Sequence, residues 1–129
     1  MSNESGRRSI LIVEDNELNR DMLCAMLEDR YYVFQAENGK EGLEVLQEHY
    51  RNISLIVLDV QMPVMNGYEA AAAIRALGTD WAQRIPIIAM TANAYADDVQ
   101  QAFDAGMNAH VTKPIDIKVV EKTISEFKK

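Results

Sequence analysis

Five short apolar runs alternate along the chain with segments whose apolar residues recur at helical spacing. The runs contain few polar positions, which is typical of strands buried on both faces of a parallel sheet. One run is less uniformly apolar than the others. It predicts an edge strand, which has a neighbouring strand on one side only. The expected strands are residues 10–13, 32–36 (the edge strand), 55–58, 85–90 and 109–111.

Five helices are expected in the segments that follow these strands, because their apolar residues share one face of a helix. The stripes are Leu18, Met22 and Ala25 or Met26; Leu43, Leu46 and Tyr50; the alanines 70–73 with Ile74 and Leu77; Tyr95, Val99 and Ala102 or Phe103; and Ile117, Val120, Ile124 and Phe127. Suitable N-caps are Asn16, Asn66 and Asp116, and suitable helix ends are Gly78 and Gly106. Trp81 falls in the expected loop before the fourth strand, as either a surface lid or a partner contact.

Strands that alternate with helices predict an α/β fold of the (βα)5 type. Crossover connections of this length require parallel neighbours and right-handed connections. A doubly wound sheet of five strands most readily takes the order 2-1-3-4-5, which is the flavodoxin-like order, and its crevice lies outside the carboxyl ends of the first and third strands. We expect one domain over residues 9–129, preceded by a flexible tail at residues 1–8.

The 129 residues include 13 basic and 20 acidic side chains, for a formal net charge of −7. An acidic surface repels nucleic-acid phosphates, so direct nucleic-acid binding is not expected. Cys24 is the single cysteine, which excludes an internal disulfide and a zinc site built from cysteines. No apolar run has the length of a signal peptide core or a membrane span, so we expect a cytoplasmic domain without direct membrane contact.

Polar residues follow four of the expected strands. Glu14 and Asp15 come after the first strand, Asp59 after the third, Thr91 after the fourth and Lys113 after the fifth. In the expected topology these strand ends meet at one rim of the sheet. Three carboxylates at such a rim repel one another, and a hard divalent cation such as Mg²⁺ relieves that repulsion.

These groups are suited to phosphoryl transfer. One carboxylate can be the nucleophile, while a metal ion, a lysine and a hydroxyl stabilise charge on the phosphoryl oxygens. Each residue also has a plainer role open to it: Asp15 can cap a helix, Thr91 can form a turn or cap, and Lys113 can be a solvated loop residue. Their common position at one rim favours the chemical interpretation.

Short motifs at these strand ends resemble those of the receiver domain of two-component response regulators, over about residues 8–128. Each motif alone is weak, but the set in this order is specific. The sequences of these motifs are most similar to those of receivers in hybrid sensor kinases and phosphorelays. They are Ile12-Val13-Glu14-Asp15-Asn16, Leu58-Asp59-Val60-Gln61-Met62-Pro63, Met65-Asn66-Gly67, Met90-Thr91-Ala92, Ala105-Gly106-Met107 and Lys113-Pro114-Ile115.

The resemblance implies that Asp59 accepts a phosphoryl group from a phosphohistidine. The donor would be a histidine kinase or a histidine phosphotransfer domain. Mg²⁺ would bind Asp15, Asp59 and the backbone carbonyl of Gln61, while Glu14 would hold a metal-bound water. The domain would then be a signalling switch that acts only on its own phosphoryl group, and a longer chain could join it to an effector or kinase domain.

The resemblance also assigns roles to the other polar residues of the rim. Thr91 would bond a phosphoryl oxygen, and Lys113 would form an ion pair with the phosphoryl group. Gln61 and Asn93 would flank the path of the water that hydrolyses the phosphorylated aspartate, and so would set its lifetime.

His110 departs from the family pattern, in which this position usually carries tyrosine or phenylalanine. In the family that ring turns inward when the hydroxyl residue, here Thr91, moves toward the phosphoryl group. A histidine fills space less well and can become charged near neutral pH. The expected output face consists of the fourth helix, the strand 109–111 and the last helix, and it is also a candidate dimer surface. The presence of His110 puts in question the coupling between phosphorylation and this face.

Three other functions compete with this interpretation. A small phosphatase with an aspartyl-phosphate intermediate commonly has a second acid two residues after the nucleophile, where this chain has Gln61. A flavin-binding module needs a phosphate loop after the first strand, where the acidic segment 14–17 would repel phosphate. A degenerate receiver used only as an interaction scaffold would lack a required site residue, and all of them are present.

Overall fold

The structure contains one sheet of five parallel strands in the order β2-β1-β3-β4-β5, which confirms the predicted topology. The computed structural model describes residues 8–60, 65–91, 96–113 and 116–127. The strands are β1 (Arg8–Val13), β2 (Tyr31–Ala36), β3 (Ile53–Asp59), β4 (Ile87–Thr91) and β5 (Ala109–Thr112). The winding reverses between β1 and β3, so the carboxyl ends of these two strands lie at the middle of one sheet edge.

The described residues form six helices, and three of them begin at predicted N-caps. The side chains of Asn16, Asn66 and Asp116 each accept a hydrogen bond from a backbone N–H of the first turn. Gly78 and Gly106 have φ values of 74° and 99°, a region that favours glycine. The helices are α1 (Glu17–Leu27), α2 (Gly39–His49), α3 (Gly67–Ala76), α4 (Asp80–Arg84), α5 (Ala96–Asp104) and α6 (Ile117–Ser125). Within the described residues, none has the length and apolar character needed to span a membrane.

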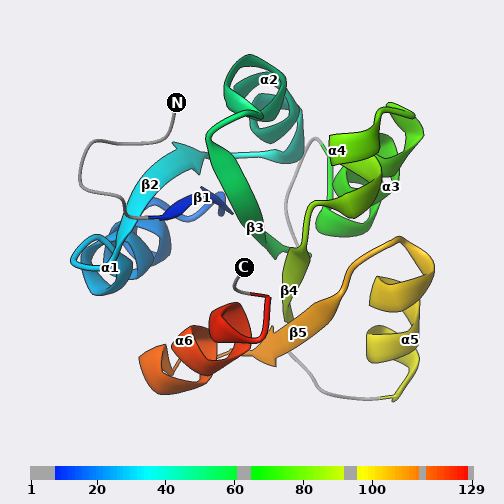
Figure 1. The fold of residues 1–129 in the computed structure, drawn as a ribbon. Coiled ribbons are helices and arrows are strands. Elements are labelled where there is room, and N and C mark those ends of the chain that lie inside the picture. The colour runs from blue at the N-terminus through cyan, green and yellow to red at the C-terminus, as the bar shows by residue number, and fades with distance from the viewer. Residues whose placement is uncertain (1–7, 61–64, 92–95, 114–115, 128–129) are drawn as a thin grey trace.

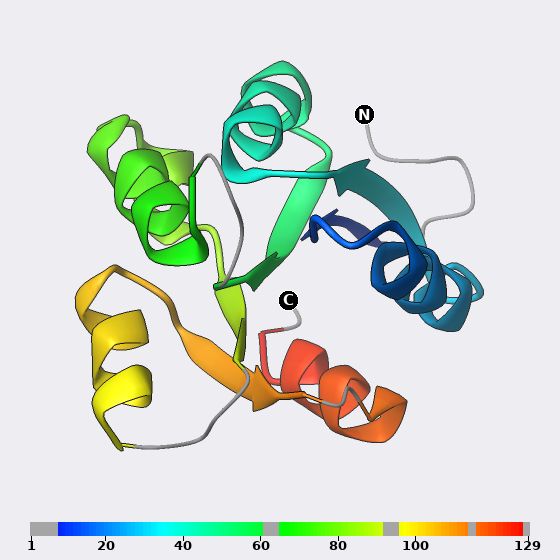
Figure 2. The same ribbon diagram turned by 180° about the vertical axis from the view of Figure 1, so that it is seen from behind.

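Helices cover both faces of the sheet (Figures 1 and 2). α1 and α6 lie on one face, while α2, α3 and α5 lie on the other, with the short α4 beside α3. Each face has its own apolar core. The core under α1 and α6 includes Leu23, Cys24, Leu27, Val120 and Ile124. The opposite core includes Leu46, Ala70, Ala71, Ile74 and Ala102, and its small alanines let α3 pack close to the sheet.

Burial along the strands follows the sequence-based expectation. Every residue of β4 is buried, and β1 and β3 each have a single half-buried position. β2 has only half-buried and exposed positions before the buried Ala36, as expected for an edge strand. At this edge the ring of Tyr32 lies 5.2 Å from that of Phe34, centroid to centroid. The buried central strands β1, β3 and β4 therefore support the residues at their carboxyl ends.

Local structure differs from the expectation at two places. Arg8, expected in the tail, is the first residue of β1, and its guanidinium donates a hydrogen bond to the Phe127 carbonyl at 3.1 Å; residues 1–7 lie outside the described part of the chain. Trp81, expected in a loop, lies in α4, where its ring stacks on that of Tyr50 at a centroid separation of 4.8 Å. α4 also shortens the expected strand 85–90, which begins at Ile87.

The apolar stripe that predicts α1 faces solvent at Leu18 and Met22, whereas its Met26 is half-buried against the core. Leu18 is 70% exposed and Met22 is 49% exposed. The side of α1 that packs on the sheet contains Leu23, Cys24 and Leu27 instead. α1 therefore presents apolar side chains to solvent beside the end of β1.

Arg75 joins three segments at the far end of α3. Its guanidinium donates two hydrogen bonds to the Gly106 carbonyl, at 3.0 and 2.7 Å, and one to the Ala82 carbonyl at 2.8 Å. A further bond of 2.9 Å reaches the side-chain oxygen of Asn108, which also accepts the N–H of Ile87. These bonds hold α4 and the turn before β5 against α3.

Candidate functional site

Four strand ends bring the expected polar residues to one rim of the sheet. Asp59 and Thr91 are the last residues of β3 and β4. Glu14 and Asp15 follow β1 directly, and Lys113 follows β5 directly. The rim is thus assembled from segments far apart in the sequence by the parallel register of the strands.

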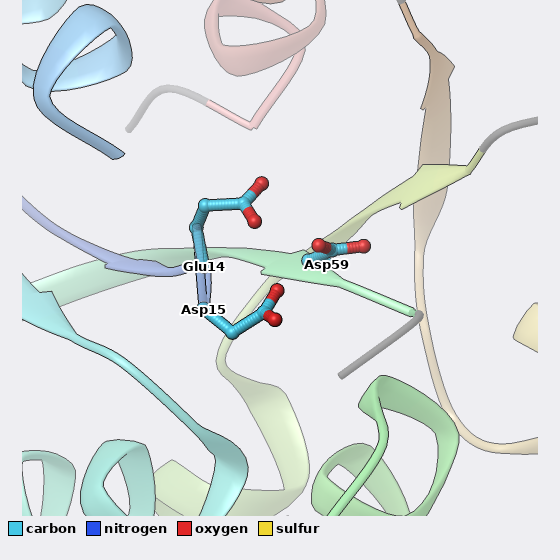
Figure 3. Close-up of side chains that lie close together, drawn as sticks. All are labelled: Glu14, Asp15 and Asp59. Atoms are coloured by element: carbon cyan, nitrogen blue, oxygen red, sulfur yellow. The ribbon is translucent and has the colours of Figure 1, made fainter. Parts of the chain in front are cut away.

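The three carboxyl groups of the rim lie close together (Figure 3). One carboxylate oxygen from each of Glu14, Asp15 and Asp59 lies within 4.8 Å of the others. Glu14 and Asp59 are only 1% exposed, whereas Asp15 is exposed to solvent. The site therefore has a buried floor made by two acids and an open side at the third.

Lys113 supplies positive charge to the two buried acids. Its ammonium nitrogen lies 3.0 Å from Asp59 Oδ1 and 3.8 Å from Glu14 Oε1, and its side chain is 29% exposed. The backbone N–H of Lys113 donates to the Thr91 carbonyl at 2.7 Å, which fixes the Lys113 backbone against the end of β4. With all four groups ionised, the cluster has two more negative charges than positive ones.

Burial gives Glu14 an unusual titration behaviour. Removal from water raises the pKa of its carboxyl group to about 7, and the nearby Asp59 adds to this rise. The hydrogen bond that Glu14 Oε2 accepts from the Asn16 N–H, at 3.1 Å, and the charge of Lys113 act in the opposite direction. Near neutral pH the Glu14 carboxyl group is therefore close to the point at which it gains or loses its proton.

The donor set fits a magnesium ion. Mg²⁺ holds oxygen ligands at about 2.1 Å, so opposite ligands lie about 4.2 Å apart. The rim offers three carboxylates within 4.8 Å of one another, one of them on the solvent side where waters can complete an octahedron. A divalent cation would also balance the surplus negative charge around Glu14 and Asp59.

The backbone around Asp59 is tightly packed. A Cβ atom on Gly67 would collide with the Asp59 carbonyl oxygen, and the Gly67 N–H donates to the Val60 carbonyl at 3.1 Å. The Val60 N–H in turn donates to the Met90 carbonyl at 3.2 Å. Only glycine allows α3 to begin this close to the end of β3, so the start of α3 packs directly against the backbone of Asp59 and Val60.

Two expected site residues, Gln61 and Asn93, lie outside the described residues, as does Tyr95. His110 is half-buried in β5, where it is the register partner of Ala89. Ala89 belongs to the core on the face that α5 covers. His110 therefore lies on the face of the sheet that α5 covers.

Sequence reasoning missed Arg20 of α1. Its Nη1 atom donates a hydrogen bond of 2.9 Å to the backbone carbonyl of Glu14. Arg20 follows Glu14 by six residues in the sequence. This spacing is a weak signal for the contact, and the sequence offers no other.

Comparisons with known proteins identify the family of this chain. The family model described as "Response regulator receiver domain" matches residues 10–125. The sensor histidine kinase RcsC of Escherichia coli K12 is 34% identical over 119 residues, which cover 92% of this chain and 12% of the kinase. The polar-differentiation response regulator DivK of Brucella anthropi is 33% identical, with 93% of this chain and 95% of DivK covered. The chain thus spans a small part of the sensor kinase RcsC and nearly all of DivK.

Solved structures show the same architecture. The chemotaxis protein CheY4 of Vibrio cholerae superposes with a TM-score of 0.87 at 28% identity, covering 95% of this chain and 99% of CheY4. The receiver domain of Saccharomyces cerevisiae Ssk1, in a complex with the histidine phosphotransfer protein Ypd1, gives 0.85 at 32%, with 94% and 88% covered. The receiver of a Pseudomonas aeruginosa PAO1 sensor histidine kinase, with a magnesium ion in its active-site cleft, gives 0.80 at 32%, with 95% and 98% covered.

The strand order, the acidic rim with its lysine and the matched family model lead to one assignment. The chain belongs to the response regulator receiver domains, the signalling domains of two-component and phosphorelay systems.

Proposed function

We propose that Asp59 is the phosphoacceptor of this domain and that its phosphorylation switches the domain between two conformations. The observation that carries the proposal is the position of the Asp59 carboxylate, which is buried at the rim 3.0 Å from the Lys113 ammonium group and beside Glu14 and Asp15. An acceptor needs a fixed carboxylate and groups that neutralise the incoming phosphoryl charge. This rim has both.

The proposed step is an in-line displacement at phosphorus. An Asp59 carboxylate oxygen forms a bond to the phosphorus atom while the bond from phosphorus to the donor's imidazole nitrogen breaks. The nitrogen keeps the electron pair of the broken bond, so the donor returns to a neutral histidine and Asp59 becomes an acyl phosphate. Hydrolysis of that acyl phosphate later restores the carboxylate and releases inorganic phosphate.

Three residues would hold Mg²⁺ through their side chains or waters: Asp15 and Asp59 directly, and Glu14 through a bound water. The backbone carbonyl of Gln61 is the proposed third direct protein ligand, beside Asp15 and Asp59. When bound, the ion supplies positive charge that offsets the charge on the phosphoryl oxygens. This chemistry is supported by the fit of the acidic cluster and by the magnesium ion of the Pseudomonas receiver.

Lys113 and Thr91 would stabilise the phosphorylated form. Lys113 already lies within hydrogen-bonding distance of Asp59, so it can follow the added charge of about −1.5 to −2 onto the phosphoryl oxygens. Thr91 is 1% exposed at the end of β4 and has a hydroxyl that can donate to such an oxygen. Movement of Thr91 would displace the end of β4, and His110 lies in β5, the strand that pairs with β4.

We propose a histidine kinase or a histidine phosphotransfer domain as the phosphodonor. The donor must bring its histidine over the rim, and α1 begins two residues after Asp15. Leu18 and Met22, which lie one turn apart on α1, are 70% and 49% exposed. An apolar pair beside the rim suits the exposed apolar face of a partner helix. The complex of the Ssk1 receiver with Ypd1 supports a partner of this class.

The proposal includes two finer points. Gln61 and Asn93 would orient the hydrolytic water and so set the lifetime of the acyl phosphate. The domain would act only on its own phosphoryl group. The face formed by α5, β5 and α6 would carry the signal to a partner or to a second copy of the domain. The cytoplasmic location stays a prediction from the sequence.

The proposal is tested by phosphorylation with acetyl phosphate, which needs no partner protein. The wild-type protein should become phosphorylated in Mg²⁺ and not in EDTA. Asp15→Asn should weaken Mg²⁺ binding and phosphorylation together, while Asp80→Asn on the distant α4 should change neither. Phosphorylation at the same rate in EDTA, or an Asp15→Asn variant with unchanged Mg²⁺ affinity, would contradict the proposal.

A further inference from the structure

Arg20 occupies a specific place next to the acidic rim. It lies in α1, four residues after Asn16, whose carbonyl accepts the Arg20 backbone N–H at 2.9 Å. From there the half-buried side chain turns back toward β1 and donates from Nη1 to the Glu14 carbonyl oxygen at 2.9 Å. Across the described residues Arg20 forms no ion pair within 4.0 Å, although Glu17 and Asp21 are its neighbours on α1. Its guanidinium is thus held by a backbone oxygen rather than by a carboxylate.

The contact completes the fixation of Glu14. The Glu14 N–H donates to the Ala36 carbonyl at 3.1 Å, which holds the end of β1 against β2. The Glu14 side chain accepts the Asn16 N–H at 3.1 Å and has Lys113 at 3.8 Å. The Glu14 carbonyl is the remaining polar group of the residue, and Arg20 satisfies it.

The orientation of that carbonyl matters for the metal site. The peptide unit between Glu14 and Asp15 connects two of the three carboxylates whose oxygens converge within 4.8 Å. If this peptide rotates, the two side chains move in different directions, and a small octahedral ion tolerates little departure from its ligand positions. A charge-assisted hydrogen bond to the Glu14 carbonyl restrains this rotation.

We propose that Arg20 is a positioning residue for the metal-binding rim: its hydrogen bond to the Glu14 carbonyl holds Glu14 and Asp15 in the arrangement that binds Mg²⁺. This inference rests on the proposed function and adds a residue that touches neither the ion nor the phosphoryl group. It is comparable to the outer-shell partners that orient metal ligands in other proteins.

Charge and hydrogen bonding make opposite predictions for this residue. Arg20 is a cation near an acidic site, so its charge alone opposes the binding of Mg²⁺. Removal of the side chain should therefore strengthen Mg²⁺ binding if only its charge matters. Removal should weaken Mg²⁺ binding if its hydrogen bond positions the ligands. The sign of the change decides between the two.

The experiment measures the affinity for Mg²⁺ alone, by titration calorimetry, in the wild type, Arg20→Met and Arg20→Lys. Arg20→Met removes every donor, and we expect affinity to fall roughly three- to tenfold, as for the loss of one such bond. Arg20→Lys keeps the charge but loses the planar guanidinium, and we expect a smaller fall. Arg84→Met, at an exposed position before the amino end of β4, makes the same charge change and should leave the affinity close to that of the wild type.

Urea unfolding in EDTA separates positioning from folding. Arg20→Lys, which retains a donor, should keep the wild-type unfolding midpoint and still bind Mg²⁺ more weakly than the wild type. Unchanged or tighter Mg²⁺ binding in both Arg20 variants would overturn the inference while leaving the proposed function intact. A wild-type protein that binds no Mg²⁺ would refute the proposed function itself, and this inference with it.

Discussion

The ammonium nitrogen of Lys113 lies 3.0 Å from a carboxylate oxygen of Asp59, across the end of β4 that separates their strands. This ion pair connects the end of β5 to the end of β3 before any phosphoryl group arrives. The same ammonium group lies 3.8 Å from Glu14, so one cation partly neutralises two buried acids. Binding of a metal ion or addition of a phosphoryl group will therefore change the charge that Lys113 partly neutralises in the resting site.

Replacement of Lys113 by methionine should destabilise the metal-free protein. Without the ammonium group Glu14 and Asp59 repel each other in a buried environment, and we expect a loss of roughly 1–3 kcal/mol. Mg²⁺ should recover part of this loss because it supplies the missing positive charge. Urea unfolding in EDTA and in Mg²⁺ measures both effects.

The matched control for this change is Lys118→Met, which removes one charge from an exposed position of α6. It should alter stability by less than about 0.5 kcal/mol. Equal effects of the two variants would show that Lys113 acts through net charge alone.

The raised pKa of Glu14 predicts how the stability of the metal-free protein depends on pH. The folded protein holds the Glu14 proton up to about pH 7, whereas an unfolded chain releases it near 4.5. Between these values the folded state binds more protons, so the free energy of unfolding should fall as pH rises. The contribution of Glu14 should be roughly 1–3 kcal/mol, fully present below the lower value and lost above the higher one.

Glu14→Gln isolates this contribution, because the amide does not titrate. In EDTA the difference in stability between Glu14→Gln and the wild type should change in favour of the variant as pH rises through this window. Urea titrations at several pH values provide the measurement. A difference that stays constant with pH would mean that Glu14 has an ordinary pKa.

His110 should weaken the coupling between the phosphorylated site and α5. A beryllofluoride phosphate mimic with Mg²⁺ should shift the amide resonances of α5, since His110 lies in β5 on the face that α5 covers. A histidine fills less space on this face than a tyrosine, so we expect smaller shifts in the wild type than in a variant with tyrosine at this position.

His110→Tyr and His110→Gln serve as comparisons, because they change the size and shape of the side chain at this position. The tyrosine variant should give the largest amide shifts in α5. Identical shifts in all three proteins would show that residue 110 takes no part in the response.

The topology was predictable because its signal is local. Runs such as Leu55-Ile56-Val57-Leu58 contain no polar position and therefore predict strands buried on both faces, as β3 is. Alternation with helices then determines parallel pairing, and parallel pairing brings Glu14, Asp59 and Lys113 to one rim. The N-caps Asn16 and Asn66 were predictable for the same reason, since a capping side chain acts within its own first turn.

Features that depend on tertiary packing were not predictable. Both sides of α1 contain apolar residues, so the spacing predicts a helix without showing that Leu18 faces solvent and Leu23 faces the sheet. α4 is too short to give a periodic pattern around Trp81. Arg75 binds the carbonyl of Gly106, 31 residues away, and no pattern in one sequence identifies such a pair.

The position of the acceptor can be measured directly. The protein is phosphorylated by a phosphorylated histidine phosphotransfer domain in Mg²⁺, the acyl phosphate is reduced with borohydride to homoserine, and the modified residue is located by mass spectrometry. The account predicts homoserine at position 59 in the wild type and none in Asp59→Asn, whose amide keeps the size of the side chain. Homoserine derived from Asp15 in the wild-type protein, or phosphoryl transfer that persists in Asp59→Asn, would contradict it.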